Sequence, residues 1–275
     1  MIELPEAAVL AQQLNDTVQG KRITNVITNA SPHKFAWFYG DPQNYHEMLT
    51  GREMGRAVTY GGMIQIAVEG YALVFAEGVR LGFHDVNEKR PLKHQLFIEF
   101  EDESALSATI QMYGGLWCFP DGEFQNPYYL GAKAKPSPLS ADFHKNYFDS
   151  IINAPGTEKL SAKALLATEQ RIPGLGNGVL QDILYNAGIH PKKKVGQLTE
   201  ADRERLYQSV KSTLAEMVFQ GGRDTETDLF GCPGGYRTKL SKKTTDKPCP
   251  VCGMNIVKEA YMGGSIYYCT GCQKM

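Results

Sequence analysis

Four cysteines near the end of the sequence have the spacing of a metal site. They form two Cys-x-x-Cys pairs, Cys249 with Cys252 and Cys269 with Cys272. Each pair directs two thiolates at one centre, and four thiolates suit a tetrahedral zinc ion that keeps no open position for catalysis. The stretch between the pairs has β-forming residues on both sides of a Gly-Gly dipeptide, which predicts a hairpin. We therefore expect one structural zinc in a β-hairpin zinc finger; reduced or disulfide-bonded cysteines are the alternative.

A second chemical feature is the glycine-rich turn Pro173–Asn177, which contains Gly174 and Gly176. It lies between two stretches with helical patterns, so the first backbone N–H groups of the following helix lack helical partners. Such N–H groups and the helix dipole attract anions, for example a DNA phosphate, and the Asn177 side chain can add a contact. Helix pairs with glycine-rich turns occur in many proteins, so the turn alone indicates an anion site and no particular function.

The charge distribution points to the same half of the chain. The net charge of the 275 residues is −1, but residues 133–275 carry 20 basic and 14 acidic side chains, net +6. Residues 1–132 carry 9 basic and 16 acidic side chains, net −7. The asymmetry favours contact between the C-terminal half and a polyanion, with a solvated surface as the alternative. The further lysines that we expect to bind phosphate are Lys192, Lys239 and Lys242.

The sequence also carries expectations about location. No apolar run approaches membrane-spanning length, and the first residues lack a basic region followed by an apolar one. We therefore expect neither a membrane segment nor a secretory signal. With four cysteines assigned to metal, Cys118 and Cys232 are far apart in the sequence and are expected to be reduced. A cytoplasmic protein, associated with the nucleoid when bound, is the resulting interpretation.

The hydrophobic pattern divides the chain into three parts. A helix is expected over residues 5–19, with Pro5 in its first turn and Gly20 at its end. Alternating patterns then predict a β-sandwich, with strands at 22–28, 63–68, 72–76, 94–100 and 105–113. Residues 131–140 are the expected linker, and helices are expected at 141–153, 161–169, 176–186 and 200–219. The predicted fold class is α+β, with domains at 1–130 (N-terminal helix and β-sandwich), 131–228 (helical) and 229–275 (linker and zinc finger).

Taken together, four features resemble the formamidopyrimidine-DNA glycosylase / endonuclease VIII family of DNA repair enzymes. In the family's order they are Glu3–Glu6, the Pro173–Asn177 turn followed by Ala187–Pro191, Gly221–Asp224 leading into Gly231–Tyr236, and the cysteine pairs. The resemblance covers essentially the whole chain. It implies a β-sandwich, a helix–two-turn–helix DNA-binding domain and a zinc finger, acting as a monomer on damaged or abasic double-stranded DNA. It also implies that Lys163 binds phosphate together with the turn.

In that family the chemistry starts at the N-terminus. The initiator Met is removed, and the exposed Pro attacks C1′ of the nucleoside through its amine, forming a Schiff base that leads to strand cleavage. Here Ile2 occupies the position of that Pro, so we expect Met1 to be retained and its amine to lie one residue away. The resemblance assigns proton transfer to Glu3. Glu6 matches a second glutamate, for which a favourable charge in the first helical turn is nearly as good an explanation.

Other places also depart from the family pattern. Residues 75–80 have no counterpart of the family's DNA-probing methionine, and its void-filling Arg–Phe region falls near residues 111–114. Gly62 falls near the family's catalytic-domain lysine, and Gly264 falls at its zinc-finger arginine. The residues that match therefore serve folding and phosphate binding, whereas those that differ serve chemistry and lesion recognition. Three hypotheses stay open: a DNA glycosylase/AP lyase with an unusual nucleophile, a DNA-binding member that has lost the chemistry, and a monofunctional glycosylase in which Glu3 activates water.

Overall fold

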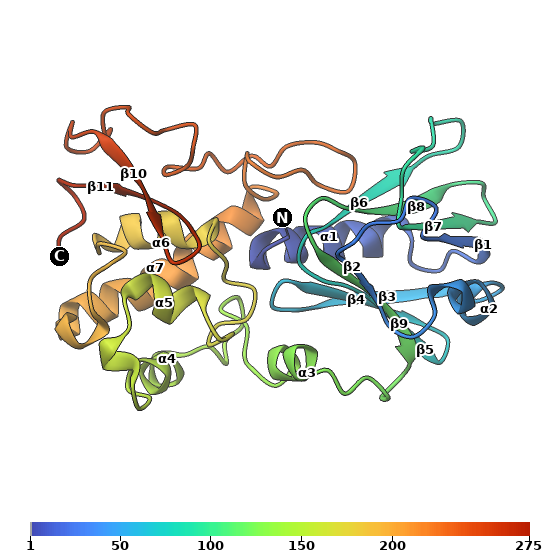
Figure 1. The fold of residues 1–275 in the computed structure, drawn as a ribbon, viewed down its shortest axis with the longest axis horizontal. Helices are drawn as coiled ribbons and strands as arrows, with labels where there is room; N and C mark the ends of the chain where they lie inside the picture. Colours follow the sequence, from blue (N-terminus) through green and yellow to red (C-terminus); the bar gives the residue numbers. More distant parts are fainter. Residues whose placement is uncertain (1) are drawn as a thin grey trace. The chain divides into compact units, whose positions relative to one another are not determined.

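The structure, a computed structural model, describes residues 2–275. The chain forms two compact units, each with its own buried core. The first unit runs up to Leu130 and also contains the later segment Gly221–Gly235 (Figure 1). The second unit contains Gly131–Gln220 and Tyr236–Met275. A short helix, α3 (Pro127–Lys133), spans the boundary at which the first unit gives way to the second.

The first unit is a β-sandwich of two open sheets. One sheet has the order β1-β7-β8-β6 and the other β2-β9-β5-β4-β3, in which β2 and β9 are parallel. Apolar residues from both sheets share one buried cluster. The strands are β1 (Ile23–Thr28), β2 (Ala36–Phe38), β3 (Met54–Tyr60), β4 (Met63–Val68), β5 (Tyr71–Phe75), β6 (Val79–His84), β7 (Leu96–Phe100), β8 (Ala105–Ile110) and β9 (Gly114–Pro120). Between β2 and β3 lie η1 (Pro42–Asn44) and α2 (Tyr45–Leu49).

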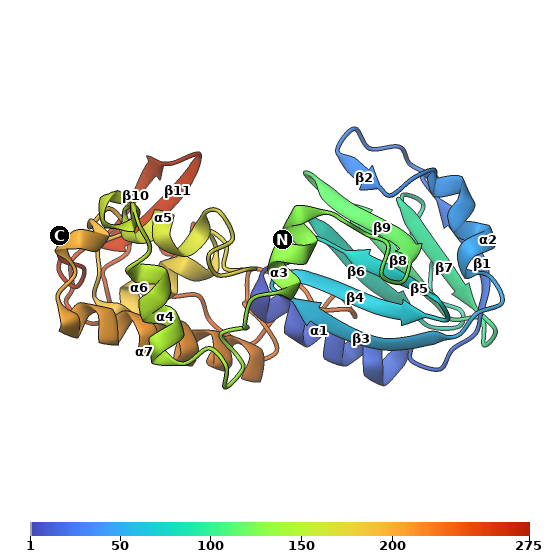
Figure 2. The same ribbon diagram turned by 90° about the horizontal axis from the view of Figure 1, so that it is seen from below.

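Helix α1 (Leu4–Thr17) lies along β3 and β4 (Figure 2). Pro5 occupies its first turn, where the missing N–H removes no helical hydrogen bond. After its end Gly20 adopts φ +83°, a conformation that glycine reaches without steric cost. Asn15 Nδ2 donates to Ala57 O at 3.0 Å, and Asn15 Oδ1 accepts from the Ala57 N–H at 2.7 Å. The helix therefore satisfies backbone groups of the edge strand β3 and fixes the start of the chain on the sheet.

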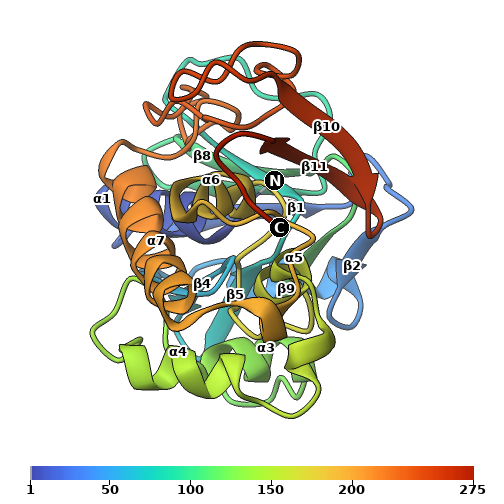
Figure 3. The ribbon, with the colours of Figure 1, turned by 90° about the vertical axis from the view of Figure 1, so that its left-hand side faces the viewer.

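The second unit is helical and ends in a β-hairpin. Helix α6 packs against α7, and the hairpin packs against α6 (Figure 3). Ser161 Oγ caps α5 by accepting the Ala164 N–H at 3.2 Å, and Thr199 Oγ1 caps α7 by accepting the Asp202 N–H at 3.1 Å. The elements are α4 (Lys145–Ile152), η2 (Thr157–Lys159), α5 (Ala162–Ala167), α6 (Val179–Ala187), η3 (Val195–Gln197), α7 (Glu200–Phe219), β10 (Ile256–Tyr261) and β11 (Gly264–Cys269).

These elements confirm the predicted α+β class, with an N-terminal helix, a β-sandwich, helices and a C-terminal hairpin. The expected helix at 200–219 coincides with α7. Strands β2, β3, β6 and β9 were not predicted. Strand β9 is buried along nearly its whole length, so it shows no alternation of polar and apolar residues. The expected linker at 131–140 begins inside α3. Within residues 2–275, every helix is too short or too polar to cross a bilayer.

Candidate functional site

The four cysteines of the two Cys-x-x-Cys pairs meet at one point. Their sulfur atoms all lie within 4.8 Å of one another, with Cys249 Sγ 3.7 Å from Cys272 Sγ and Cys252 Sγ 3.3 Å from Cys269 Sγ. Four thiolates around a tetrahedral zinc ion with bonds of about 2.3 Å are about 3.8 Å apart, so the cluster has the dimensions of such a site. The Tyr185 hydroxyl of α6 lies 3.0 Å from Cys249 Sγ and ties the cluster to the helices. The predicted metal-binding set is therefore brought together.

The hairpin β10–β11 is attached to α5, to α6 and to the turn before α6 by three polar side chains. Lys163 Nζ donates to Tyr261 O at 2.6 Å, and Asn177 Nδ2 donates to Ser265 O at 3.0 Å. Gln181 Nε2 also donates to Ser265 O at 3.1 Å, while its Oε1 accepts the Tyr267 N–H at 3.0 Å. These bonds place Lys163, Asn177 and the tip of the hairpin side by side.

Gly264, at the tip of the hairpin, faces both Lys163 and Asn177. A Cβ atom at position 264 would lie 3.5 Å from Lys163 Nζ and 3.6 Å from Asn177 Nδ2, which is ordinary van der Waals contact. Lys163 is buried, and this burial lowers the pKa of its ammonium. Asn177 is exposed. One cation, one amide and a hairpin tip without a side chain thus form a compact polar cluster.

The other predicted DNA-binding residues lie in varied surroundings. Lys192 Nζ forms an ion pair with the Glu259 carboxylate of β10. Lys239 Nζ donates to Asn186 Oδ1 at 2.8 Å, and Lys242 is exposed. In the turn itself Gly174 has φ +75°, and Gly176 O accepts the Leu180 N–H at 3.3 Å at the start of α6. Lys163 and Asn177 are therefore the two predicted residues that the structure brings together.

Two glutamates at the start of α1 are buried together with one arginine. Glu3, Glu6 and Arg223 are 6 %, 5 % and 2 % exposed. Arg223 Nε donates to Glu6 Oε1 at 2.8 Å and Arg223 Nη2 donates to Glu6 Oε2 at 2.7 Å, a forked pair. Arg223 Nη1 lies 3.5 Å from Glu3 Oε2. Burial opposes the guanidinium charge, but the two carboxylates outweigh it and raise the pKa of Arg223.

Two backbone N–H groups complete the surroundings of the Glu6 carboxylate. The Arg223 N–H donates to Oε1 at 3.3 Å and the Glu3 N–H donates to Oε2 at 3.2 Å. An ionised carboxylate has about four acceptor positions. Four donors therefore occupy Glu6, which fixes the segment Gly221–Asp224 against the first turn of α1.

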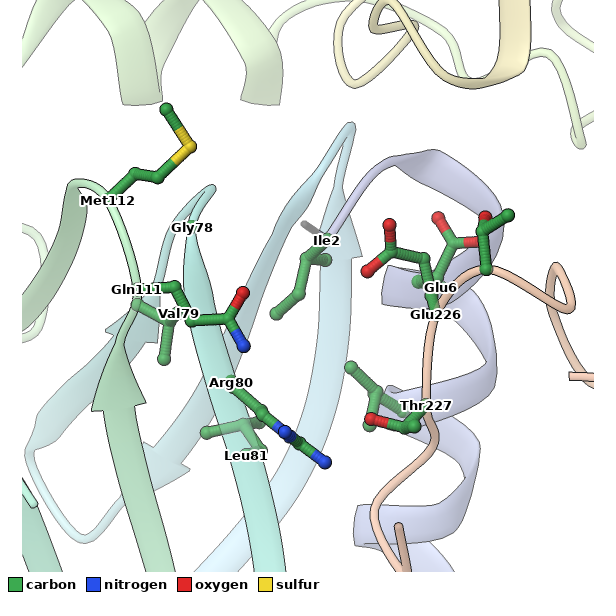
Figure 4. Close-up of a pocket in the computed structure, with 12 residues that line it drawn as sticks. Ile2, Glu6, Gly78, Val79, Arg80, Leu81, Gln111, Met112, Glu226 and Thr227 are labelled. Atoms are coloured by element: carbon green, nitrogen blue, oxygen red, sulfur yellow. The ribbon is translucent and has the colours of Figure 1, made fainter. Parts of the chain in front are cut away.

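Ile2 lines a cavity of about 290 Å³ in the first unit. Its side chain is 4 % exposed and belongs to the core shared by the two sheets. Figure 4 shows Ile2 between Glu6 on one side and Gln111 on the other, with Arg80 reaching in from β6. Met1, whose amine was a predicted catalytic group, lies outside the described residues. Gly62 is buried in the turn between β3 and β4.

Two residues of these clusters were not assigned a role from the sequence. Arg223 stands inside the quoted Gly221–Asp224 motif, but its pairing with Glu6, 217 positions earlier, has no local signal. Gln181 follows Asn177 by four positions, which places both on one face of a helix. That spacing was the available clue to its contact with Ser265.

The fold and the site define a class of two-unit proteins, with a β-sandwich that buries two glutamates in one unit and helices followed by a four-cysteine hairpin in the other. The family model described as the formamidopyrimidine-DNA glycosylase H2TH domain matches residues 135–228. Residues 135–228 therefore carry the H2TH domain of that family, and the curated relatives and solved structures support the resemblance to formamidopyrimidine-DNA glycosylases noted in the sequence.

Individual relatives match along almost the whole chain. A formamidopyrimidine-DNA glycosylase of Bacillus cereus is 27% identical over 281 residues, covering 99% of both chains. One of Listeria monocytogenes is 27% identical over 285 residues, covering 100% of both. The MutM (Fpg) protein of Thermus thermophilus has a TM-score of 0.82 at 25% identity, covering 98% of both chains. The Lactococcus lactis Fpg in complex with DNA containing an abasic site has a TM-score of 0.84 at 20% identity, covering 99% of this chain and 100% of that one.

Proposed function

We propose that this protein binds damaged or abasic double-stranded DNA and acts on it as a base-excision-repair DNA glycosylase/AP lyase-like enzyme. The observation that carries the proposal is the cavity beside Ile2 and Glu6, at the position where the family resemblance places the catalytic amine. A cavity of about 290 Å³ can accept a group of the size of a nucleobase. The Lactococcus lactis relative, named for its complex with abasic-site DNA, supports the choice of partner.

The DNA backbone would be held by the cluster of Lys163, Asn177 and the hairpin tip. Lys163 supplies a charged donor with three N–H bonds, of which one is directed at Tyr261 O. The Asn177 amide is exposed beside it. Contacts of this kind recognise phosphate and carry no sequence information, so binding should be strongly salt-dependent and similar for all sequences.

The proposed roles of the N-terminal residues follow from their surroundings. Ile2 is built into the core and lacks the secondary amine that the family uses, so Schiff-base chemistry should be weak. Glu3 directly follows Ile2, and its contact with the Arg223 guanidinium positions its carboxylate to accept a proton from an attacking water. Glu6 is occupied by four donors, so we assign it a positioning role rather than proton transfer.

The remaining parts of the proposal concern the ion, the assembly and the location. Zn²⁺ is the ion that a closed set of four thiolates selects, and it would be structural because no coordination position is left for substrate. The Cys249, Cys252, Cys269 and Cys272 sulfurs would hold it. The protein would act as a monomer in the cytoplasm and associate with the nucleoid through DNA. A DNA-binding member without catalysis is the second candidate, favoured by the buried Ile2.

Borohydride trapping on an abasic-site duplex, combined with intact-mass analysis of the protein, tests the proposal. We expect weak trapping by the wild type and stronger trapping by Ile2→Pro, because that change creates a secondary amine beside Glu3 once Met1 is removed. Base release from damaged DNA should disappear in Glu3→Gln but persist in the matched variant Glu47→Gln, whose side chain is exposed on α2. Efficient trapping by wild type with Met1 retained would identify another amine as the nucleophile. DNA binding without base release in any variant would establish the binding-only candidate.

A further inference from the structure

A second cavity of the first unit, of about 350 Å³, lies on the outer face of the four-stranded sheet. Strands β6 and β8 are neighbours in this sheet, and alternate residues of each belong to the core between the two sheets. The side chains in between point to the opposite face, because successive residues of a strand alternate. This second cavity, which we call the outer cavity, is lined by such residues, namely Arg80, Gly82 and His84 of β6 and Ser107 and Thr109 of β8.

His84 and Ser107 are joined by a hydrogen bond in the wall of the outer cavity. His84 Nε2 lies 2.8 Å from Ser107 Oγ. When Nε2 carries no proton, the serine hydroxyl donates to it, which is the arrangement of a serine nucleophile and its general base. Burial, and then the charge of Arg90, lower the pKa of His84, whereas Glu88 raises it. The ring is therefore mainly neutral at pH 7, the form that can accept a proton.

Gly82 leaves an open position beside both of these atoms. It pairs with Ser107 across the β6–β8 ladder, and His84 is two residues further along the same strand. A Cβ atom at Gly82 would lie 3.3 Å from Ser107 Oγ and 3.6 Å from His84 Nε2. A substrate carbon at this point would be at the distance of a reactive complex, about 3–3.5 Å from the nucleophile. The absence of a side chain at Gly82 thus provides room for a reacting group.

Two charged residues of the outer cavity would support a reaction at this point. Arg80 precedes Gly82 by two residues on β6, so it is a diagonal neighbour of Ser107. Diagonal neighbours are about 7–8 Å apart, within reach of a long side chain, so the guanidinium can approach an oxygen that becomes negative above Gly82. Glu88 Oε2 accepts a backbone N–H of its own loop at 3.1 Å, and its charge favours the protonated form of His84.

The remaining wall of the outer cavity is mainly apolar. Pro91 contributes to it from the loop between β6 and β7, and Leu229 and Phe230 contribute from the segment Gly221–Gly235. The Phe83 N–H donates to Leu229 O at 2.9 Å, which fixes this wall to the edge of β6. A cavity of this size and lining suits a small molecule with an apolar part and one polar reacting group.

We propose that the outer cavity is an esterase site for small carboxylic esters, with Ser107 as nucleophile, His84 as general base and Arg80 as the group that stabilises the oxyanion. Ser107 Oγ attacks the carbonyl carbon while His84 Nε2 takes the hydroxyl proton. The tetrahedral intermediate then collapses, the bond to the alcohol oxygen breaks, and His84 returns the proton to the departing alcohol. Water attacks the acyl-serine in the same way and releases the carboxylic acid.

This activity goes beyond the proposed function on DNA and does not rest on it. Neither Ser107 nor His84 lines the cavity beside Ile2. Measurements on esters therefore decide the outer cavity whether or not the protein binds DNA.

Incubation of the full-length protein with a fluorophosphonate tests the nucleophile directly. An activated serine displaces fluoride from phosphorus, and the phosphonyl group stays on its oxygen. We expect peptide mass spectrometry to find the label on Ser107, and we expect Ser107→Ala and Gly82→Ala to lose it. Ser150→Ala, which changes an exposed serine on α4, is the matched control and should be labelled like wild type. Absence of the label from Ser107 in the wild type would overturn the proposal, and that result needs no variant.

Hydrolysis of p-nitrophenyl acetate measures the reaction and the role of each group. Acylation followed by slower water attack should give an initial burst of p-nitrophenolate. His84→Gln can keep the hydrogen bond to Ser107 but cannot take its proton, so release should slow about 10²–10⁴-fold. Arg80→Gln should lower kcat on the order of 10²-fold, and Arg80→Lys should recover part of that loss.

Thermal melting checks that each variant folds. Gly82→Ala leaves both reacting side chains in the protein and carries the kinetic test if Ser107→Ala unfolds. Equal rates of ester hydrolysis in wild type, Gly82→Ala and His84→Gln would refute the site, because other groups of the protein would then cleave the ester. In that case the bond between His84 and Ser107 serves only to join β6 to β8.

Discussion

Arg223 and Glu6 form a buried fork, with Nε 2.8 Å from Oε1 and Nη2 2.7 Å from Oε2. The pair joins the first turn of α1 to the segment Gly221–Asp224 within the first unit. Because Glu3 lies against the same guanidinium, the fork also determines where the proposed proton acceptor sits.

Glu6→Gln should destabilise the first unit by about 3–5 kcal/mol, because removing one partner leaves a buried charge poorly compensated. Urea unfolding followed by circular dichroism measures the loss. Glu47→Gln, an exposed position on α2, is the matched control and should stay within about 0.5 kcal/mol of wild type. A Glu6→Gln protein as stable as this control would mean that the fork contributes little to folding.

Gly264→Arg should bind duplex DNA about three- to ten-fold more tightly, because it adds a guanidinium beside Lys163 and Asn177. The backbone at this position is outside the left-handed region, and the space for a Cβ is ordinary, so the substitution should fold. Fluorescence anisotropy at several salt concentrations should show the salt slope steepening by about one. Gly264→Gln adds similar bulk without charge; an equal gain in that variant would exclude a phosphate contact.

Cys252→Ala should remove the metal and unfold residues 248–275, while the β-sandwich stays folded. Metal binding to small modules of this kind contributes folding free energy on the order of 10 kcal/mol. Elemental analysis should find one zinc per wild-type chain, and hydrogen exchange should localise the unfolding. Cys232→Ala replaces an exposed cysteine outside the cluster and should keep the metal. Full zinc content in Cys252→Ala would contradict the four-ligand site.

Stability of the first unit should fall as the pH drops below about 6.5, the ordinary pKa of histidine, partly because of His84. Burial, and then the charge of Arg90, lower the pKa of His84, whereas Glu88 raises it. The unfolded chain therefore takes up the proton first, so the contribution is complete above the unfolded pKa and is lost on acidification. Melting temperatures from pH 8 to pH 5 should decline less in His84→Gln, and an identical decline would exclude this cause. The ring nitrogen Nε2 lies 2.8 Å from Ser107 Oγ, a contact that glutamine can retain.

The features that the sequence predicted well are those with local signals. The cysteine spacing identified the four-cysteine cluster, and the long helical pattern located α7 from Glu200 to Phe219. A helix was expected from residue 161 onward, and Ser161 caps α5. In each case neighbouring residues along the chain are sufficient to determine the local structure.

The features that could not be predicted depend on partners distant in sequence. Nothing near Glu6 in the sequence indicates that Arg223 will bind its carboxylate, and nothing near Trp37 indicates that Trp37 will pair with Gly115 in the parallel β2–β9 ladder. Strand β9 escaped notice because both of its faces are buried. The importance of Ile2 and Gly264 was inferred from the family resemblance, because the replacement of a functional residue leaves no recognisable pattern in a single sequence.

The discontinuous make-up of the first unit has a consequence for biosynthesis. Glu3 and Glu6 emerge from the ribosome among the first residues, but Arg223 follows Glu6 by 217 positions. At translation rates of about 5–20 residues per second, Arg223 is synthesised about 10–40 s after the two glutamates. Until then the two carboxylates lack their cationic partner, so the start of α1 should stay hydrated and loosely attached to the nascent β-sandwich. The pairing of Glu3 and Glu6 with Arg223 is therefore a late event of synthesis. It is completed only after the helices of the second unit have left the ribosome.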